Sequence, residues 1–265
     1  MWAHEFFRHA LLTGLLASLA CGVVGTYVVT KRIVFLSGGI SHAAYGGIGL
    51  ACFLGWEPLW GATVFAVLAA LGMGLVAKGA GQREDTVIGV MWAVGMAIGI
   101  IFLSLTPGYS ADLMSYLFGS LLTVPKSDLL LMVGLDAAIL VAVAIFFHQL
   151  QAWAFDEEFA GLMGLPVRAL YLLLLGLIAL TVVITIRVVG VILVIALLTI
   201  PSALGVRLGG SLGRAMVWAV LLGSALTTAG LCLSCYTNLP CGALIILLAG
   251  LVYLLVSCRP ASATR

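Results

Sequence analysis

Residues 37–47, with the sequence SGGISHAAYGG, have the types and spacing best suited to chemistry in this chain. They place one imidazole, that of His42, beside the hydroxyl of Ser41 and between two pairs of glycines. A neutral imidazole nitrogen can bind zinc, manganese or iron, and glycines permit a broken helix whose freed carbonyls bind ions. A histidine hydrogen-bonded to a neighbouring helix would give the same pattern. The residues alone leave these two alternatives about equal.

Two aspartates are further candidates for binding or relaying a cation. Asp136 lies about two turns into an apolar stretch, where ionisable groups are costly and often functional. A carboxyl group hydrogen-bonded inside a helical bundle is the commoner explanation of such a residue. Asp112 lies four residues before Tyr116, so the two side chains could share one face of a short helix and attract a cation. A solvated loop acid is the commoner alternative there.

Three cysteines form the last cluster that could carry chemistry. Cys232 and Cys235 have the spacing of a metal-binding or disulfide pair, and Cys241 follows six residues later. Cysteine in apolar stretches more often acts as a small hydrophobic residue. The sequence contains no Gly-x-x-x-x-Gly-Lys-Ser/Thr loop, no His-Glu-x-x-His and no Gly-x-Ser-x-Gly. These absences exclude ATP hydrolysis by a phosphate-binding loop and disfavour common hydrolase sites.

The composition requires lipid as the solvent of most side chains. Of the 265 residues, 63% are hydrophobic and 8% are charged, against about 25% charged in soluble domains. Backbone groups inside lipid must bond internally, and the long apolar runs lack the alternation of barrel strands. Helices are therefore expected. No run of basic residues is longer than Lys31-Arg32, so the sequence offers no nucleic-acid surface.

We expect residues 1–265 to form a single all-α transmembrane bundle of about nine spans, each near the 20 residues that cross the hydrocarbon. Eight or ten spans are possible, because the break between the sixth and seventh spans is marked only by Arg187 and Gly190 within one apolar run. The first span lacks the features of a cleaved signal peptide and is read as retained. Gly95-x-x-x-Gly99 would let another backbone approach closely, although such pairs also occur by chance. The spans lie near residues 10–30, 33–54, 58–77, 86–106, 128–150, 169–187, 188–206, 213–234 and 240–257.

The basic residues predict the orientation of the bundle. Nine of the twelve Lys and Arg residues fall in alternate connections on one side, and Arg8, Lys126 and Arg187 fall on the other. Basic residues collect in cytosolic connections. The nine-span arrangement therefore places the C-terminus in the cytosol and the N-terminus outside. Residues 106–128 then form the longest outer connection. Residues 151–168, with three consecutive acids and a compact helical pattern, form the longest cytosolic one.

Over nearly its full length the chain resembles the permease subunit of zinc/manganese/iron-type ABC importers. The resemblance rests on four segments in the same order and spacing: residues 31–49 (KRIVFLSGGISHAAYGGIG), 85–89 (DTVIG), 116–119 (YLFG) and 189–201 (VGVILVIALLTIP). It implies a type II ABC importer-like permease fold and a transport subunit with no permanently bound cofactor. It further implies a second permease copy, two ATPase subunits, and an extracytoplasmic protein that delivers the metal ion.

The resemblance also assigns residues to roles. Residues 151–168 would be the cytosolic coupling segment that contacts the ATPase, with an acid-rich start and a small-x-x-x-Gly element made by Asp156, Glu157, Glu158, Ala160 and Gly164. The metal path of the family commonly reads Asp-x-x-Ser-His. Ser41 and His42 match that motif, whereas Gly38 takes the place of its aspartate. Asp112 could supply the missing carboxylate, or His42 could act as a transient ligand.

Two other functions are weighed against a metal permease. Permeases for siderophores or cobalamin share a similar fold, but they are usually longer, with ten spans, and would not need the Ser-His pair. A membrane-embedded enzyme or a scaffold is the alternative from another class. An intramembrane protease would need a serine–histidine or paired-aspartate geometry across helices, and the sequence shows no convincing set.

Overall fold

The computed structural model describes residues 5–79, 84–106, 119, 121 and 124–258, and this part of the chain is almost entirely helical. It contains no β-strand. The described helices are α1 (Glu5–Thr30), α2 (Val34–Leu54), α3 (Pro58–Gly79), α4 (Glu84–Leu105), α6 (Lys126–Phe155), α7 (Glu157–Leu162), α8 (Val167–Val189), α9 (Val191–Gly209), α10 (Leu212–Thr237) and α11 (Cys241–Ser257).

Seven of these helices are long and apolar enough to cross a membrane: α1, α3, α4, α6, α8, α9 and α10. Helix α11 is apolar but has 17 residues, and α2 has 21 residues yet does not belong to the seven. Each of the nine predicted spans coincides with a described helix. The expected multi-pass helical bundle is confirmed, whereas the number of nine crossings stays a prediction.

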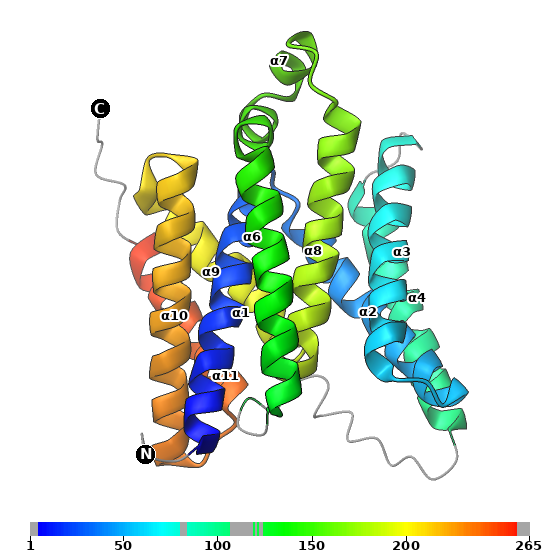
Figure 1. Ribbon diagram of the computed structural model, residues 1–265, viewed down its shortest axis with the longest axis vertical. Coiled ribbons are helices and arrows are strands. Elements are labelled where there is room, and N and C mark those ends of the chain that lie inside the picture. Colours follow the sequence, from blue (N-terminus) through cyan, green and yellow to red (C-terminus); the bar gives the residue numbers. More distant parts are fainter. Residues whose placement is uncertain (1–4, 80–83, 107–118, 120, 122–123, 259–265) are drawn as a thin grey trace.

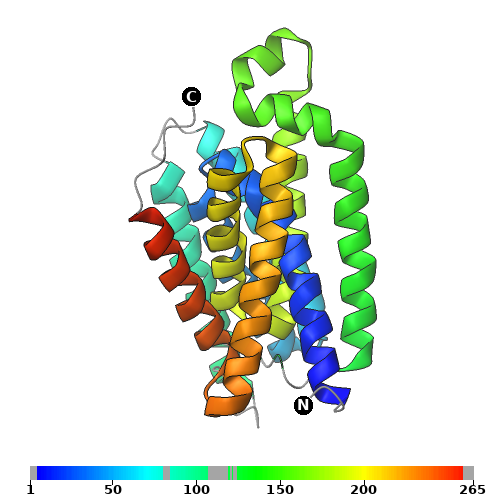
Figure 2. The same cartoon turned by 90° about the vertical axis from the view of Figure 1, so that its left-hand side faces the viewer.

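The long helices form two groups joined mainly by α8 (Figure 1). Helices α2, α3 and α4 pack together on one side, and α1, α9, α10 and α11 lie on the other; α8 contacts both groups, and α6 packs against α1 and α8. The apolar windows of α1 and α8 are each 72% buried, whereas those of α4 and α6 are 22% buried. The core therefore lies around α1 and α8. The short helix α7 projects beyond the ends of the long helices (Figure 2).

Helix α2 is surrounded by protein over most of its length. Its buried residues run almost without a break from Leu36 to Ala51. Serine, glycine and histidine lower the hydropathy of this helix, which explains why its composition alone does not mark it as a span. Polar groups in direct contact with hydrocarbon are costly. The neighbouring helices α3, α4 and α8 pack against α2, so that its polar side chains lie within the protein.

Glycines allow α2 to approach its two neighbours closely. Gly47 of α2 lies against the Gly61 carbonyl of α3, at a distance that leaves no room for a side chain. On α4, Gly95 lies against Ala43 and Gly99 lies against Tyr45. The close approach predicted from Gly95-x-x-x-Gly99 is confirmed. Small residues at a helix interface let backbones pack directly, and this is a principal source of helix association in lipid.

The poorly marked boundary between the sixth and seventh predicted spans lies at one glycine. Helix α8 ends at Val189 and α9 begins at Val191, and Gly190 between them has φ +83° and ψ 159°. Residues with a side chain rarely adopt this conformation, so glycine permits the sharp break inside an otherwise apolar run.

Replacing Gly95 with valine tests the close packing of α2. A Cβ atom at Gly95 would lie 2.7 Å from the Ala43 Cα, whereas one at Gly89 of the same helix would meet no heavy atom within 4 Å. We expect Gly95→Val to lower the free energy of unfolding by about 1–3 kcal/mol, as overpacking typically does, and Gly89→Val to have a much smaller effect. Thermal unfolding in detergent measures both variants. Equal melting temperatures would contradict this packing.

Candidate functional site

The imidazole of His42 is half-buried in α2 and stacks on the indole of Trp92 in α4. The ring centroids are 4.1 Å apart and the ring planes differ by 14°. The Nδ1 atom of His42 is buried and has no hydrogen-bond partner among the described residues. A histidine whose role is to join two helices would be expected to bond through its nitrogens. The orphaned nitrogen therefore favours a ligand role over a packing role.

The position of the absent family carboxylate is partly filled by the same indole. A Cβ atom at Gly38 would lie 3.4 Å from the Trp92 ring and 4.0 Å from Ile195 of α9. Gly38 thus leaves space that the tryptophan ring occupies. No sequence signal distinguishes Trp92, because a tryptophan inside an apolar span is typical of an ordinary packing residue.

Ser41 is fully buried, and its hydroxyl donates a hydrogen bond to the Ser37 carbonyl at 2.9 Å. Because the hydroxyl proton is used in this bond within α2, only the lone pairs of the Ser41 oxygen remain available to another partner. Asp112 and Tyr116 lie outside the described residues. Among the described residues no group of three or more His, Cys, Asp or Glu side chains could hold a metal ion. Within this part of one chain, His42 is therefore not part of a coordination site of three or more such side chains.

The other sequence candidates do not join His42 in a ligand set. Asp136 is buried on α6, and neither of its carboxyl oxygens has a hydrogen-bond partner among the described residues. The commoner explanation expected from the sequence, a hydrogen-bonded carboxyl, is therefore not what the structure shows. Cys232, Cys235 and Cys241 are free thiols, so the disulfide considered for them is not formed.

An ion cluster that the sequence analysis missed lies at the end of the bundle opposite α7. Arg187, in the last turn of α8, contacts Asp128 at the start of α6, with Nε 2.9 Å from Oδ2. Its Nη1 lies 3.1 Å from Oε1 of Glu57, which precedes α3. The Asp128 side chain is 10% exposed, whereas that of Glu57 is 54% exposed. One guanidinium thus holds the ends of three helices, and the three side chains together carry a net negative charge.

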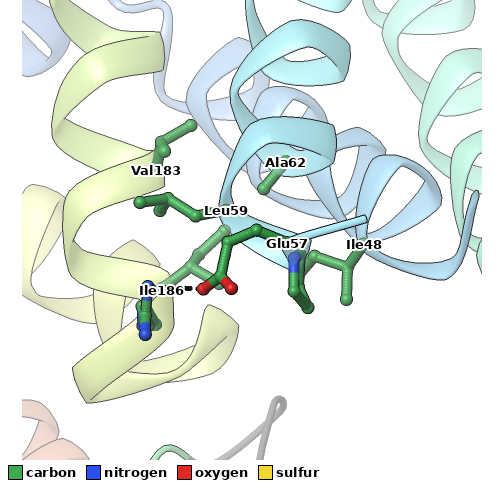
Figure 3. Close-up of a pocket in the computed structure, with 8 residues that line it drawn as sticks. Ile48, Glu57, Leu59, Ala62, Val183 and Ile186 are labelled. Carbon is green, nitrogen blue, oxygen red and sulfur yellow. Dashed lines mark ion pairs between the residues drawn. The ribbon is translucent and has the colours of Figure 1, made fainter. Parts of the chain in front are cut away.

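A cavity of about 220 Å³ lies beside this cluster (Figure 3). Glu57 and Arg187 supply its charged side chains, and α2, α3 and α8 supply apolar ones such as Ile48 and Val183. Ile48 is six residues beyond His42 on α2, a rise of about 9 Å along the helix. The cavity therefore lies between His42 and the end of the bundle at which Glu57 sits.

The segment predicted for coupling is an ordered short helix. Asp156 caps α7, because its Oδ1 accepts a hydrogen bond from the Phe159 backbone N–H at 2.9 Å, and Glu157 and Glu158 occupy the first turn. Acids at these positions favour a helix start through capping and the helix dipole. Ala160 is fully buried, and its carbonyl accepts the Leu165 N–H at 3.0 Å. Gly164 has φ +75°, which suits glycine where the chain turns back.

Besides its acidic start, α7 exposes large apolar side chains. Phe159, Leu162 and Met163 are exposed there, and Leu162 reaches 88% exposure. These residues lie beyond the ends of the long helices, away from the faces that would contact hydrocarbon (Figure 2). Exposed apolar groups gathered on a projecting element are typical of a protein contact surface.

The chain is similar to known membrane transport proteins over nearly its whole length. The sequence model of the ABC 3 transport family matches residues 3–259. A protein of Chlamydia pneumoniae described as a probable metal transport system membrane protein is 40% identical, over 91% of this chain and 85% of its own length. The manganese transport system membrane protein MntC of Listeria monocytogenes is 31% identical, over 94% and 89%.

A solved structure extends the similarity to three dimensions. The structure described as PsaBC from Streptococcus pneumoniae in complex with Fab contains a chain with 32% identity and a TM-score of 0.88. The match covers 98% of this chain and 94% of that one. The arrangement of helices seen here is thus shared with that protein along almost its entire length.

Replacing Arg187 tests the ion cluster. We expect Arg187→Gln to lower the free energy of unfolding by about 1–3 kcal/mol, because it leaves the buried Asp128 carboxylate without its counter-charge. Glu57→Gln is the control, and it should cost less than about 1 kcal/mol because Glu57 is half-exposed. Thermal unfolding in detergent at low and high salt measures both. The interpretation fails if Glu57→Gln is as damaging as Arg187→Gln.

Proposed function

Since the chain belongs to the ABC 3 transport family, we propose that it forms the membrane path of an ATP-driven importer for a divalent transition metal. Its homologues are metal transport permeases, and the chain is accordingly a transport subunit and not an enzyme. Manganese is the first cargo to test, because relatives at 29% and 31% identity are named manganese transport proteins. Zinc and iron are the other candidates. A siderophore or cobalamin cargo is the runner-up.

The observation that carries this proposal is the orphaned nitrogen of His42 inside an enclosed helix. The Nδ1 atom of His42 is buried at membrane depth without a protein partner, so it would ligate a passing cation once the path opens to it. Among the described residues, no group of three or more His, Cys, Asp or Glu side chains forms a closed site around it. Ligation by one imidazole, completed by water or by the second copy of the chain, is weak. Weak binding suits a conduit, because a tight site would hold the ion.

The distribution of basic residues orients this path. With the basic connections in the cytosol, α7 faces the cytosol and the Arg187 cluster faces outwards. The cavity beside Glu57 then lies on the outer side of His42, and the neighbouring cluster of Glu57, Asp128 and Arg187, with its net negative charge, favours an arriving cation. An extracytoplasmic metal-binding protein would deliver the ion to this side. Two copies of the chain would enclose the path, with the His42 side chains near the interface.

The projecting helix α7 is the contact for the ATPase in this proposal. Asp156, Glu157 and Glu158 fix the start of the helix, and Gly164 returns the chain to α8. Ala160 is buried, so it supports the segment from inside instead of touching a partner. The apolar surface of Phe159, Leu162 and Met163 is what a separate ATPase chain would cover.

Replacing His42 with alanine tests whether its imidazole lies on the metal path. In cells carrying the complete transporter, we expect His42→Ala to reduce manganese uptake by about tenfold or more, equivalent to about 1.4 kcal/mol on the barrier. His148→Ala is the control, because His148 is an exposed histidine on α6. Uptake of radioactive manganese, zinc, iron and an iron siderophore is measured at equal amounts of protein in the membrane. Normal uptake by His42→Ala would remove His42 from the path, and uptake of the siderophore alone would favour the runner-up.

A charge placed on α7 tests ATPase docking. We expect Leu162→Asp to abolish copurification of the ATPase, because a carboxylate would have to be buried in an apolar interface. Leu208→Asp is the matched control, since Leu208 is an exposed leucine near the end of α9 on the same side of the bundle. The measurement is the amount of ATPase retained with the tagged permease. Full retention by Leu162→Asp would exclude α7 as the docking element.

A further inference from the structure

Lys31 occupies the short connection between α1 and α2 and reaches across to the coupling segment. Its Nζ lies 3.1 Å from Oε2 of Glu157, the first residue of α7. It also donates a hydrogen bond to the Trp153 carbonyl at 3.3 Å and lies 4.2 Å from the centroid of the Trp153 ring. One ammonium group therefore contacts a carboxylate, a carbonyl and an aromatic ring at the junction of α6 and α7.

The Lys31 side of this junction is largely shielded from water. The Lys31 side chain is 16% exposed and Trp153 is fully buried, whereas the Glu157 side chain is 42% exposed. Charge-assisted hydrogen bonds and cation–π contacts are stronger where water is excluded. The Trp153 ring also packs edge-on against Tyr171 of α8, with centroids 6.1 Å apart. Lys31 thus contacts the end of α6 and the start of α7 directly, and Trp153 connects this junction to α8.

The connection that carries Lys31 is itself rigid. The Lys31 N–H bonds to the Tyr27 carbonyl at 2.9 Å, and the Ile33 N–H bonds to the Val28 carbonyl at 3.0 Å. Arg32 between them has φ +59°, which gives a tight turn. Helix α2 begins at Val34, three residues after Lys31. A displacement of the Lys31 ammonium would therefore be transmitted directly through this short connection to the start of α2.

We propose that Lys31 is the positioning residue that links movement of α7 to movement of α2. The proposal rests on the function proposed above, in which α7 contacts the ATPase and α2 carries His42 on the metal path. A push or pull on α7 displaces Glu157 and the end of α6, and the Lys31 ammonium carries that displacement to the first turn of α2. Lysine suits this task because its compact ammonium directs three donors to three partners.

The test compares transport with ATP hydrolysis in the purified complete transporter, reconstituted into lipid vesicles and supplied with manganese. We expect Lys31→Met to keep the ATPase bound and hydrolysing ATP, while the metal ions moved per ATP fall by a factor of about five or more, the lower range of typical coupling between sites. Arg32→Met is the matched control, because Arg32 is the exposed neighbour. It should leave the ratio of metal to ATP unchanged.

Exchanging the charges of Lys31 and Glu157 distinguishes a role in coupling from a role in stability alone. Lys31→Glu combined with Glu157→Lys should recover much of the ratio that either single variant loses, at similar melting temperatures. If Lys31→Met does not assemble, Glu157→Gln tests the same contact from its other partner. An unchanged ratio in these variants would overturn the role of Lys31, as would a parallel loss of melting temperature, ATPase binding and transport. Failure of the unaltered transporter to move any metal would instead overturn the proposed function.

Discussion

The close approach of α2 to α3 and α4 is the constraint on which the rest of the structure depends. Glycines on all three helices, such as Gly47, Gly61 and Gly95, remove the side chains that would hold the backbones apart. A helix enclosed in this way is protected from lipid, so it can carry serine, glycine and histidine at membrane depth. The same packing carries Trp92 to the face of the His42 ring. Without the glycine contacts, neither the position of the imidazole nor the separation of its Nδ1 from other protein donors and acceptors would be fixed.

Charged groups act at the two ends of this bundle in similar ways. At one end Arg187 joins the starts of α3 and α6 to the end of α8, and at the other Lys31 joins the α1–α2 connection to the junction of α6 and α7. Each basic side chain has acidic partners from distant parts of the chain, and Asp128 and Lys31 are largely shielded from water. Exposed pairs contribute little, whereas shielded ones resist the loss of a partner. The start of α6 is therefore held by Arg187, and its end lies at the junction that Lys31 contacts.

The chemistry around His42 suits passage more than storage. An imidazole stacked on Trp92, with Gly38 where the resemblance leads one to expect an aspartate, offers one neutral nitrogen to a cation. A carboxylate would add charge and affinity, and its absence makes this part of the path less attractive to a divalent ion. The acidic cluster of Glu57 and Asp128 supplies negative charge elsewhere, beside a cavity whose lining residue Ile48 lies about 9 Å further along α2 from His42. In the proposed metal path, the attraction of a cation and its transient ligation would thus take place at separate positions.

The sequence alone determined that the chain is a multi-pass helical membrane protein, because composition and the length of apolar runs are local properties. It also located the His42 motif, the short helix after Asp156 and the close approach at Gly95, since helix caps and small-residue spacings are written in neighbouring positions. Trp92 beside Gly38, the partners of Arg187 and the reach of Lys31 were decided only by the tertiary structure. Each of these contacts joins residues far apart in the chain, and one sequence carries no local signal for which side chains will meet when its helices pack.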